Sequence, residues 1–171
     1  MKAVKVILGI VIVLTLAFFA TGLIVKDVKY SVEVEINKPI AEVFAKFENP
    51  TSLKEWMPEI KSIETLNEKP GKIGSTYKMI VENQGQEMEM TEKIMAYVLN
   101  EKMTFEFDSD QMLKTDDFKF VANGNSTKMI QNCTVEAKSY IMGCMFPYFK
   151  SKLEEVSLGY MNRFKEMVES N

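Results

Sequence analysis

The C-terminal stretch from Pro147 to Ser170 constrains the fold most, because its pattern predicts a long amphipathic helix that must pack against something else. Apolar side chains recur there at steps of four and three residues, which places them on one face of a helix. Pro147 suits the first turn, where a missing N–H is no loss. This predicted stripe consists of Phe149, Leu153, Val156, Tyr160, Phe164 and Met167. A helix with one such face needs a sheet or other helices to cover it.

Most of the chain before this helix has the period of two that is typical of strands. Residues 28–37 alternate apolar and polar side chains, as a half-buried strand does. Two short helices follow, the first opened by Pro39 and the second over residues 51–56. Six further strands then follow one another, with turn residues such as Asn123-Gly124 between them. The sequence predicts an α+β domain in which a curved seven-stranded antiparallel sheet wraps around the closing helix.

The first 27 residues differ in kind from the remainder. Val6 to Val25 is an uncharged run of 20 residues, which as a helix spans about 30 Å, the thickness of the hydrocarbon core of a bilayer. A cleaved signal peptide is the alternative, but its apolar core is usually only about 7 to 15 residues long. We therefore expect residues 1–27 to be a single-pass transmembrane anchor and residues 28–171 a separate domain on the extracytoplasmic side.

Composition narrows the chemistry that this domain can perform. The chain contains no histidine, which removes the commonest general base and the commonest zinc ligand. Two cysteines, Cys133 and Cys144, are too few for a disulfide framework, although one bridge is possible outside the cytoplasm. The net charge is −3 even with the N-terminal lysines included, so nucleic acid is a poor partner. We expect no metal and no cofactor.

A recognisable set of short stretches lies in the predicted domain. They are residues 34–44, Asn49-Pro50, residues 53–58, Gly71 with Gly74, and the closing helix. Together they resemble the START-like (SRPBCC) superfamily, in its polyketide cyclase/dehydrase and lipid transport group, over roughly residues 28–170. The resemblance implies a helix-grip fold with a cavity between sheet and helix, which in many members holds a lipid, sterol, polyketide or other apolar ligand. It supplies no catalytic residues, because the family shares none.

The phase of the strands and of the helix stripe predicts which side chains face such a cavity. Several of them are methionines; each one taken singly is read as an ordinary core residue, but as a group their flexible, polarizable side chains favour a pocket for ligands of varied shape. The predicted cavity residues are Tyr77, Met79, Met88, Met90, Glu92, Met103, Phe105, Phe118, Phe120, Met129 and Gln131 from the strands, with Phe149, Leu153, Val156 and Tyr160 from the helix.

Glu92 and Gln131 are the polar members of this set. An inward Glu92 would orient the polar end of a ligand or act as an acid or base, since a buried carboxylate must be paired or protonated. A bulge between Met90 and Ile94 would instead turn Glu92 toward solvent. Both alternatives fit the sequence.

Two apolar features remain beside the predicted cavity. Trp56, the only tryptophan, is expected to pack the short helices onto the sheet. The almost wholly apolar stretch 140–146 is either a buried strand end or an apolar rim. We hypothesise that it borders the mouth of the cavity and meets the membrane.

The expected function is membrane-anchored, non-catalytic binding of a hydrophobic small molecule or lipid, as a carrier, sensor or chaperone. The first alternative is a cyclase-type enzyme, for which Glu92 and Tyr77 are the candidate acid or base. The second is an envelope protein–protein interaction module whose core is filled. A ligand cavity of more than about 300 Å³ would separate the first two from the third.

Overall fold

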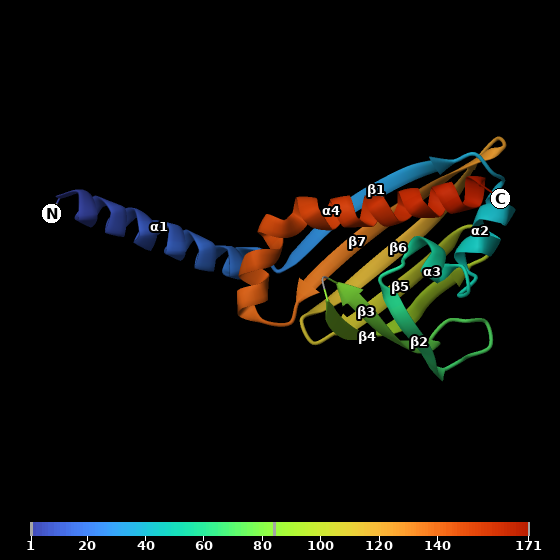
Figure 1. Cartoon of the computed structure of the whole chain (residues 1–171), viewed down its shortest axis with the longest axis horizontal. Coiled ribbons are helices and arrows are strands. Elements are labelled where there is room, and N and C mark those ends of the chain that lie inside the picture. Colours follow the sequence, from blue (N-terminus) through green and yellow to red (C-terminus); the bar gives the residue numbers. More distant parts are fainter. Residues whose placement is uncertain (1, 84, 171) are drawn as a thin grey trace.

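The computed structural model describes residues 2–83 and 85–170. Within these residues the order of elements is α1 (Lys2–Ile24), β1 (Asp27–Ile36), α2 (Ile40–Phe47), α3 (Leu53–Trp56), β2 (Ile60–Asn67), β3 (Thr76–Asn83), β4 (Gln86–Val98), β5 (Lys102–Ser109), β6 (Met112–Asn123), β7 (Ser126–Ala137) and α4 (Tyr140–Glu169). Figure 1 shows α1 projecting from a single body that contains the other elements.

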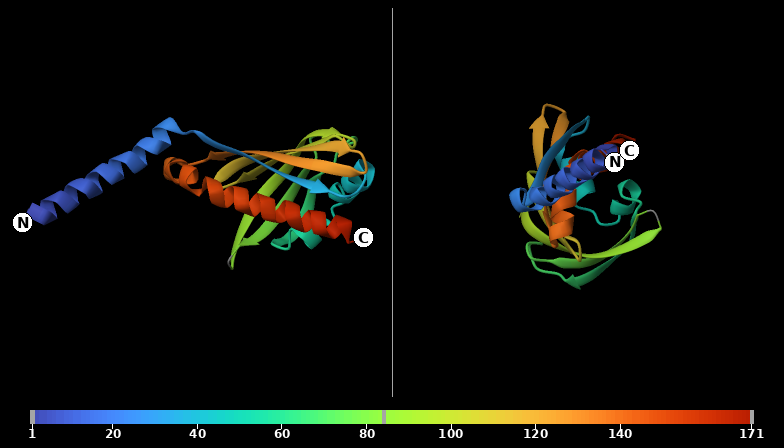
Figure 2. Two further views of the ribbon diagram at one scale, coloured as in Figure 1. Left: turned by 90° about the horizontal axis from the view of Figure 1, so that it is seen from above. Right: turned by 90° about the vertical axis from the view of Figure 1, so that its left-hand side faces the viewer.

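The strands form one antiparallel sheet in the order β1-β7-β6-β5-β4-β3-β2. Strands β2 to β7 are therefore a meander, and β1 closes the far edge beside β7. Figure 2 shows the sheet curving around α4, as accumulated strand twist requires. The predicted α+β helix-grip fold is confirmed.

Helix α4 begins seven residues earlier than the pattern predicts. The Ser139 side chain accepts a hydrogen bond from the backbone N–H of Met142, which starts the helix at Tyr140. Pro147 thus lies inside the helix, and Figure 1 shows a short first part set at an angle to the long remainder. A proline bends a helix because it lacks one N–H and crowds the preceding turn. The alternative that residues 140–146 form a buried strand end is therefore wrong.

The buried face of α4 also differs from the predicted stripe. Phe164 is fully buried as predicted, but Phe149 and Val156 are 48% and 42% exposed. The residues that α4 buries are Cys144, Ser157, Met161, Phe164 and Val168. The buried face is shifted by about one residue toward the C-terminus relative to the predicted stripe. The small Ser157 lies on this face and shares a hydrogen bond with Tyr30 of β1.

Aromatic side chains join α2, α3 and α4 to the sheet. The ring of Phe47 lies 4.8 Å from that of Phe118 on β6 and 5.6 Å from that of Phe164 on α4, centroid to centroid. Trp56 lies 5.8 Å from Phe47 and 5.2 Å from Phe164. Trp56 thus packs the short helices onto the core, as predicted, with the backbone carbonyl of Trp56 accepting a hydrogen bond from Arg163 Nε at 2.9 Å.

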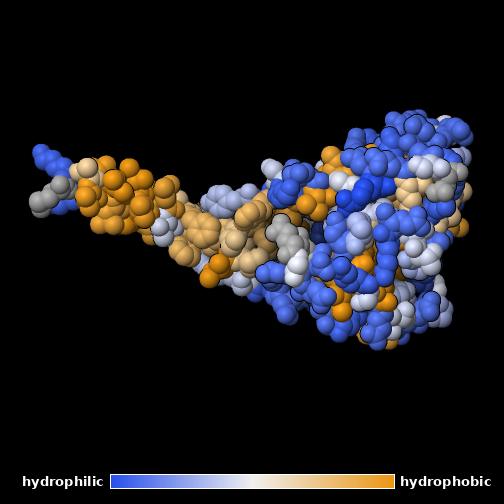
Figure 3. Space-filling model, viewed as in Figure 1, coloured by the Kyte–Doolittle hydropathy of each residue, from blue (hydrophilic) through white to orange (hydrophobic). Residues whose placement is uncertain are grey.

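Helix α1 buries none of its residues. Among the described residues it is the one helix long and apolar enough to cross a membrane, judged by length and composition. Its apolar surface is seen in Figure 3.

The C-terminal end of α1 packs on the first turns of α4. Phe18 stacks on Tyr148 at 6.0 Å and Phe19 on Tyr140 at 6.2 Å between ring centroids. Thr21 donates a hydrogen bond to the carbonyl of Cys144 at 3.2 Å. Residues 140–148 therefore hold the N-terminal helix.

The two cysteines are buried in different surroundings. Cys133 lies beside Tyr30 and Val135 in the sheet, whereas Cys144 faces α1. Both are free thiols in the described structure.

Candidate functional site

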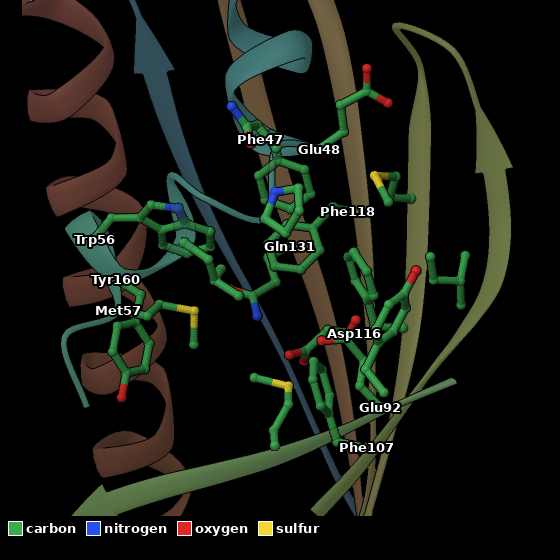
Figure 4. A pocket seen from close by; sticks show the side chains of 18 of the residues that line it. Phe47, Glu48, Trp56, Met57, Glu92, Phe107, Asp116, Phe118, Gln131 and Tyr160 are labelled. Atoms are coloured by element: carbon green, nitrogen blue, oxygen red, sulfur yellow. The ribbon is translucent and has the colours of Figure 1, made fainter. Parts of the chain in front are cut away.

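A cavity of about 360 Å³ lies between the sheet, the C-terminal half of α4 and the segment that contains α2 and α3. Its wall is mostly apolar and aromatic (Figure 4). The exposed lining residues Asn49, Pro50 and Glu68 mark its mouth, beside the α2–α3 connection and the turn after β2. Figure 1 shows these segments at the opposite end of the domain from α1.

Eight of the fifteen predicted cavity residues line this space. They are Tyr77, Met79, Glu92, Met103, Phe105, Phe118, Gln131 and Tyr160. They come from β3, β4, β5, β6, β7 and α4, so the alternation within strands and the antiparallel order bring them together.

The other seven predicted residues lie elsewhere. Phe120 and Met129 face inward but are buried in the core. Leu153 packs on a second cluster that includes Tyr30. The remaining four, which line no part of the cavity, are Met88 and Met90 on β4 and the exposed Phe149 and Val156 on α4.

The stretch 140–146 also contributes nothing to the lining. The hypothesis that it borders the cavity mouth is wrong, because the bend at Pro147 directs this stretch toward α1 instead.

Several cavity residues escaped the sequence prediction, above all Lys114 and Asp116 on β6. Phe118 and Phe120 set the inward phase of this strand, and continuing that phase back along the strand leads to Asp116 and then Lys114. The sequence prediction left these two charged residues out, although period-two alternation places them on the inward face. The lining residues of the short helices, such as Leu53 and Met57, had no strand phase to reveal them.

Glu92 points inward, so the alternative of a bulge that turns it to solvent is wrong. The irregularity in the pairing of β4 with β5 lies between Ile94 and Ala96, after Glu92. Glu92 pairs with Phe107 on β5, which pairs in turn with Lys114 on β6. This register brings a carboxyl group and an ammonium group into the same part of the cavity wall.

Asp116 is the most buried charged residue of the wall. It is 4% exposed, and its Oδ2 accepts a hydrogen bond from Lys114 Nζ at 2.8 Å. Its Oδ1 has no hydrogen-bond partner among the described residues. Burial alone would lower the pKa of Lys114, but the charge of Asp116 outweighs this and holds that pKa above its usual value.

The pKa of Glu92 is raised to about 7, first by burial and then by the charge of Asp116. A large share of Glu92 side chains therefore carry a proton at neutral pH. Figure 4 shows Glu92, Asp116 and Phe107 gathered on one side of the pocket, with Trp56, Met57 and Tyr160 on another. One wall is thus polar while its surroundings are apolar.

Other buried groups near this wall are held in neutral form. Tyr30 shares a 3.0 Å hydrogen bond with Ser157, and burial raises the pKa of its hydroxyl. Burial likewise raises the pKa of the Cys133 thiol to about 12, which makes it a poor nucleophile.

An ion pair stands at the cavity mouth. Glu48 accepts hydrogen bonds from Lys72 and, at 2.8 Å, from the hydroxyl of Tyr97. Burial opposes the charge of Glu48, but these two bonds prevail and lower its pKa. The pair ties the end of α2 to the turn between β2 and β3.

No cluster of three or more potential metal-ligating side chains is found in residues 2–83 and 85–170. The arrangement offers a carboxylate oxygen, a carboxyl group that can donate a proton, and an amide inside an apolar cavity. Such groups can orient the polar end of a ligand or exchange a proton with it.

A curved antiparallel sheet around a long C-terminal helix, with a cavity between them, defines the helix-grip class of domains. Residues 27–147 match the family described as "Polyketide cyclase / dehydrase and lipid transport", and the chain belongs to this family. The family resemblance expected from the sequence is thereby confirmed.

Solved structures share the fold at low sequence identity. A START superfamily protein from Mycobacterium smegmatis is 21% identical, with a TM-score of 0.71 over 83% of this chain and 97% of that one. The protein TTHA0849 from Thermus thermophilus is 17% identical, with a TM-score of 0.70 over 84% and 98% of the two chains. The Zhui aromatase/cyclase from Streptomyces sp. R1128 is 9% identical, with a TM-score of 0.69 over 84% and 94%. A comparison with curated protein sequences gives no significant match.

Proposed function

We propose that the chain is a membrane-anchored protein that binds a hydrophobic small molecule or lipid in its cavity and does not transform it. The observation that carries this proposal is the space of about 360 Å³ lined by apolar and aromatic side chains, which lies in the size range of small-molecule sites. Membership of a family that includes lipid transport supports it. The role is that of a carrier, sensor or chaperone for the ligand.

Helix α1 supports the anchor. A long apolar helix of a soluble core would be buried, whereas α1 is not. Next to its C-terminal end, the exposed side chains of Tyr140, Ile141, Tyr148 and Phe149 resemble the aromatic belt found at membrane–water interfaces. We propose residues 1–27 as the anchor and residues 28–171 as an extracytoplasmic domain. Protease treatment of intact cells should digest the domain, and protection from the protease would reverse the orientation.

The position of the mouth bears on how a ligand arrives. The mouth lies at the end of the domain far from α1. This favours a ligand that reaches the cavity through water or from a partner over one that slides in directly from the anchoring bilayer.

The test compares bound molecules in the full chain and in a variant with a filled cavity. Both proteins are extracted into an amphipathic polymer without detergent, and the molecules they retain are identified by mass spectrometry. Met103→Trp adds bulk to the wall of the cavity, and Met129→Leu, which alters a core position outside it, is the matched control. An apolar molecule enriched in the wild type and in Met129→Leu, but not in Met103→Trp, is expected. Equal retention by all three would favour an interaction module that holds no ligand.

The carboxyl groups in the cavity favour a cyclase-type enzyme as the second candidate. Glu92 and Asp116 both face the space, and Glu92 has a pKa suited to proton transfer near neutral pH. An enzyme would convert a bound polyketone, and Glu92→Gln would abolish conversion while leaving binding intact. Recovery of every tested polyketone unchanged would exclude this activity for those compounds and leave binding as the function.

A further inference from the structure

The polar part of the cavity wall has an unused hydrogen-bond acceptor. Asp116 is almost fully buried, and its Oδ2 accepts a hydrogen bond from Lys114, while Oδ1 has no hydrogen-bond partner in the described part of the chain. A buried polar atom left without a partner costs roughly 1 to 3 kcal/mol. Neighbouring atoms cover Oδ1, but its side chain lines the cavity, so a ligand that displaces those atoms can supply the missing donor.

Glu92 supplies the complementary group. Its side chain lines the same space, close enough to Asp116 for the charge of Asp116 to act on it. A protonated carboxyl group donates one hydrogen bond and still accepts others. A donor and an acceptor therefore stand together on an otherwise apolar surface (Figure 4).

The charges of this wall cancel. Lys114 and Asp116 form an ion pair, and a protonated Glu92 adds no charge. Of the other titratable lining residues, Tyr77 and Tyr160 are phenols, Glu48 and Lys72 form an ion pair at the mouth, and Glu68 is exposed there. A charged ligand would lose its hydration shell on entering the cavity and would meet no net opposite charge there. Such desolvation of a charge is costly in an apolar site.

We propose that the ligand is a neutral apolar alcohol whose hydroxyl group donates a hydrogen bond to Asp116 Oδ1 and accepts one from the Glu92 carboxyl group. This inference rests on the proposed binding function. A hydroxyl is the small neutral group that donates and accepts at one atom. Long-chain, alicyclic and aromatic alcohols share this chemistry. A fatty-acid carboxylate lacks the donor and brings a negative charge toward Asp116.

The test uses the full chain in an amphipathic polymer with N-phenyl-1-naphthylamine as fluorescent probe. The probe is displaced with 1-decanol, decanoate or decylamine, and the signal from Met103→Trp is subtracted as the polymer background. Decanol is expected to displace the probe at a concentration about tenfold or more lower than the concentration that decanoate or decylamine requires. This ratio corresponds to a difference in binding free energy of about 1.4 kcal/mol.

Two variants connect this preference with the wall. Glu92→Leu removes the donor and should reduce the advantage of decanol to about threefold or less, a loss of at least about 0.7 kcal/mol. Thr91→Leu, at the neighbouring exposed position on the outer face of β4, should keep the full advantage.

The outcomes separate the two proposals. If the probe gives no signal above the Met103→Trp background, the proposed binding function fails. If the probe binds but decanoate or decylamine displaces it as well as decanol does, the alcohol proposal is overturned and binding stands. A decanol preference that persists in Glu92→Leu would also overturn it, because the selectivity would then arise elsewhere.

Discussion

Lys114 Nζ lies 2.8 Å from Asp116 Oδ2 in the wall of the cavity, although both side chains are mostly removed from solvent. Two strand positions two residues apart share one face of the sheet, which brings the pair together. The pair neutralises the wall and leaves the second oxygen of Asp116 free. The chemistry of the cavity depends on this contact.

Removing the cation alone should destabilise the domain strongly. Lys114→Met leaves the buried Asp116 carboxylate unpaired, and breaking a buried ion pair in this way costs about 3 to 5 kcal/mol. Lys119→Met, on the same strand at an exposed position, should cost less than about 0.5 kcal/mol. Urea unfolding of the full chain measures both. Equal unfolding free energies for the two variants would show that the buried pair contributes little.

Glu92 should make the domain less stable as the pH rises. Its pKa is raised from 4.5 to about 7 by burial and then by Asp116, so the folded state holds the proton more tightly than the unfolded chain. The contribution of Glu92 to stability is therefore fully present below about pH 4.5 and lost as the pH rises through about 7. The loss should be roughly 1 to 3 kcal/mol.

The measurement is the difference in unfolding free energy between wild type and Glu92→Gln as a function of pH. Glutamine has similar size and no titration in this range, so the other carboxyl groups cancel in the difference. The advantage of the wild type should decline with rising pH. A difference that is constant between about pH 4.5 and 8 would contradict the shifted pKa.

Two phenylalanines on α4 test which face of that helix is buried. Phe164→Ala removes a ring packed on Phe47 and Trp56, which should cost about 3 to 5 kcal/mol. Phe149→Ala removes a ring that is half exposed and should cost less than about 1 kcal/mol. Unfolding free energies measure both costs. A Phe149→Ala variant as unstable as Phe164→Ala would mean that the helix buries a different face.

Gly22 should govern the packing of α1 on α4. A Cβ atom at Gly22 would lie 2.5 Å from Sγ of Cys144, so a larger side chain must push the helices apart. In a Cys133→Ala background, Gly22→Leu should raise the rate at which maleimide labels Cys144 by about tenfold or more. This corresponds to a free energy for separating α1 from α4 that is lower by about 1.4 kcal/mol. Gly9→Leu is the control, because nothing lies within 4 Å of that position. Equal labelling of the two variants would show that α1 does not protect Cys144.

The fold was largely predictable from the sequence because its signals are local. Alternation within each strand and turn residues between strands determine the meander, and the family resemblance agrees with it. The inward phase of β6 in fact extends from Phe120 back to Asp116 and Lys114, both of which line the cavity. The sequence prediction for this strand began at Phe118 and left out the two charged residues before it, which form an ion pair on the same face.

The sequence predictions that were wrong concern features that depend on contacts between distant segments. Pro147 fits a first helical turn equally well, and the earlier start of α4 follows from the cap at Ser139 and the packing on α1. The rotation of α4 follows from the small Ser157, which apolar periodicity does not reveal. The cavity residues of α2 and α3 belong to short elements whose placement is set by the core and not by a repeating pattern.

The position of a bound ligand tests the central claim most directly. Met79 and Met103 line the cavity, whereas Met95 lies exposed on β4 outside it. The full chain carries ¹³C-methyl methionine in a deuterated amphipathic polymer and is titrated with 1-decanol, and nuclear Overhauser effects between ligand and protein methyl groups are recorded. Cross-peaks from decanol to the methyl groups of Met79 and Met103, with none to Met95, are predicted. Cross-peaks to Met95 alone, or to no methionine, would contradict binding in the cavity.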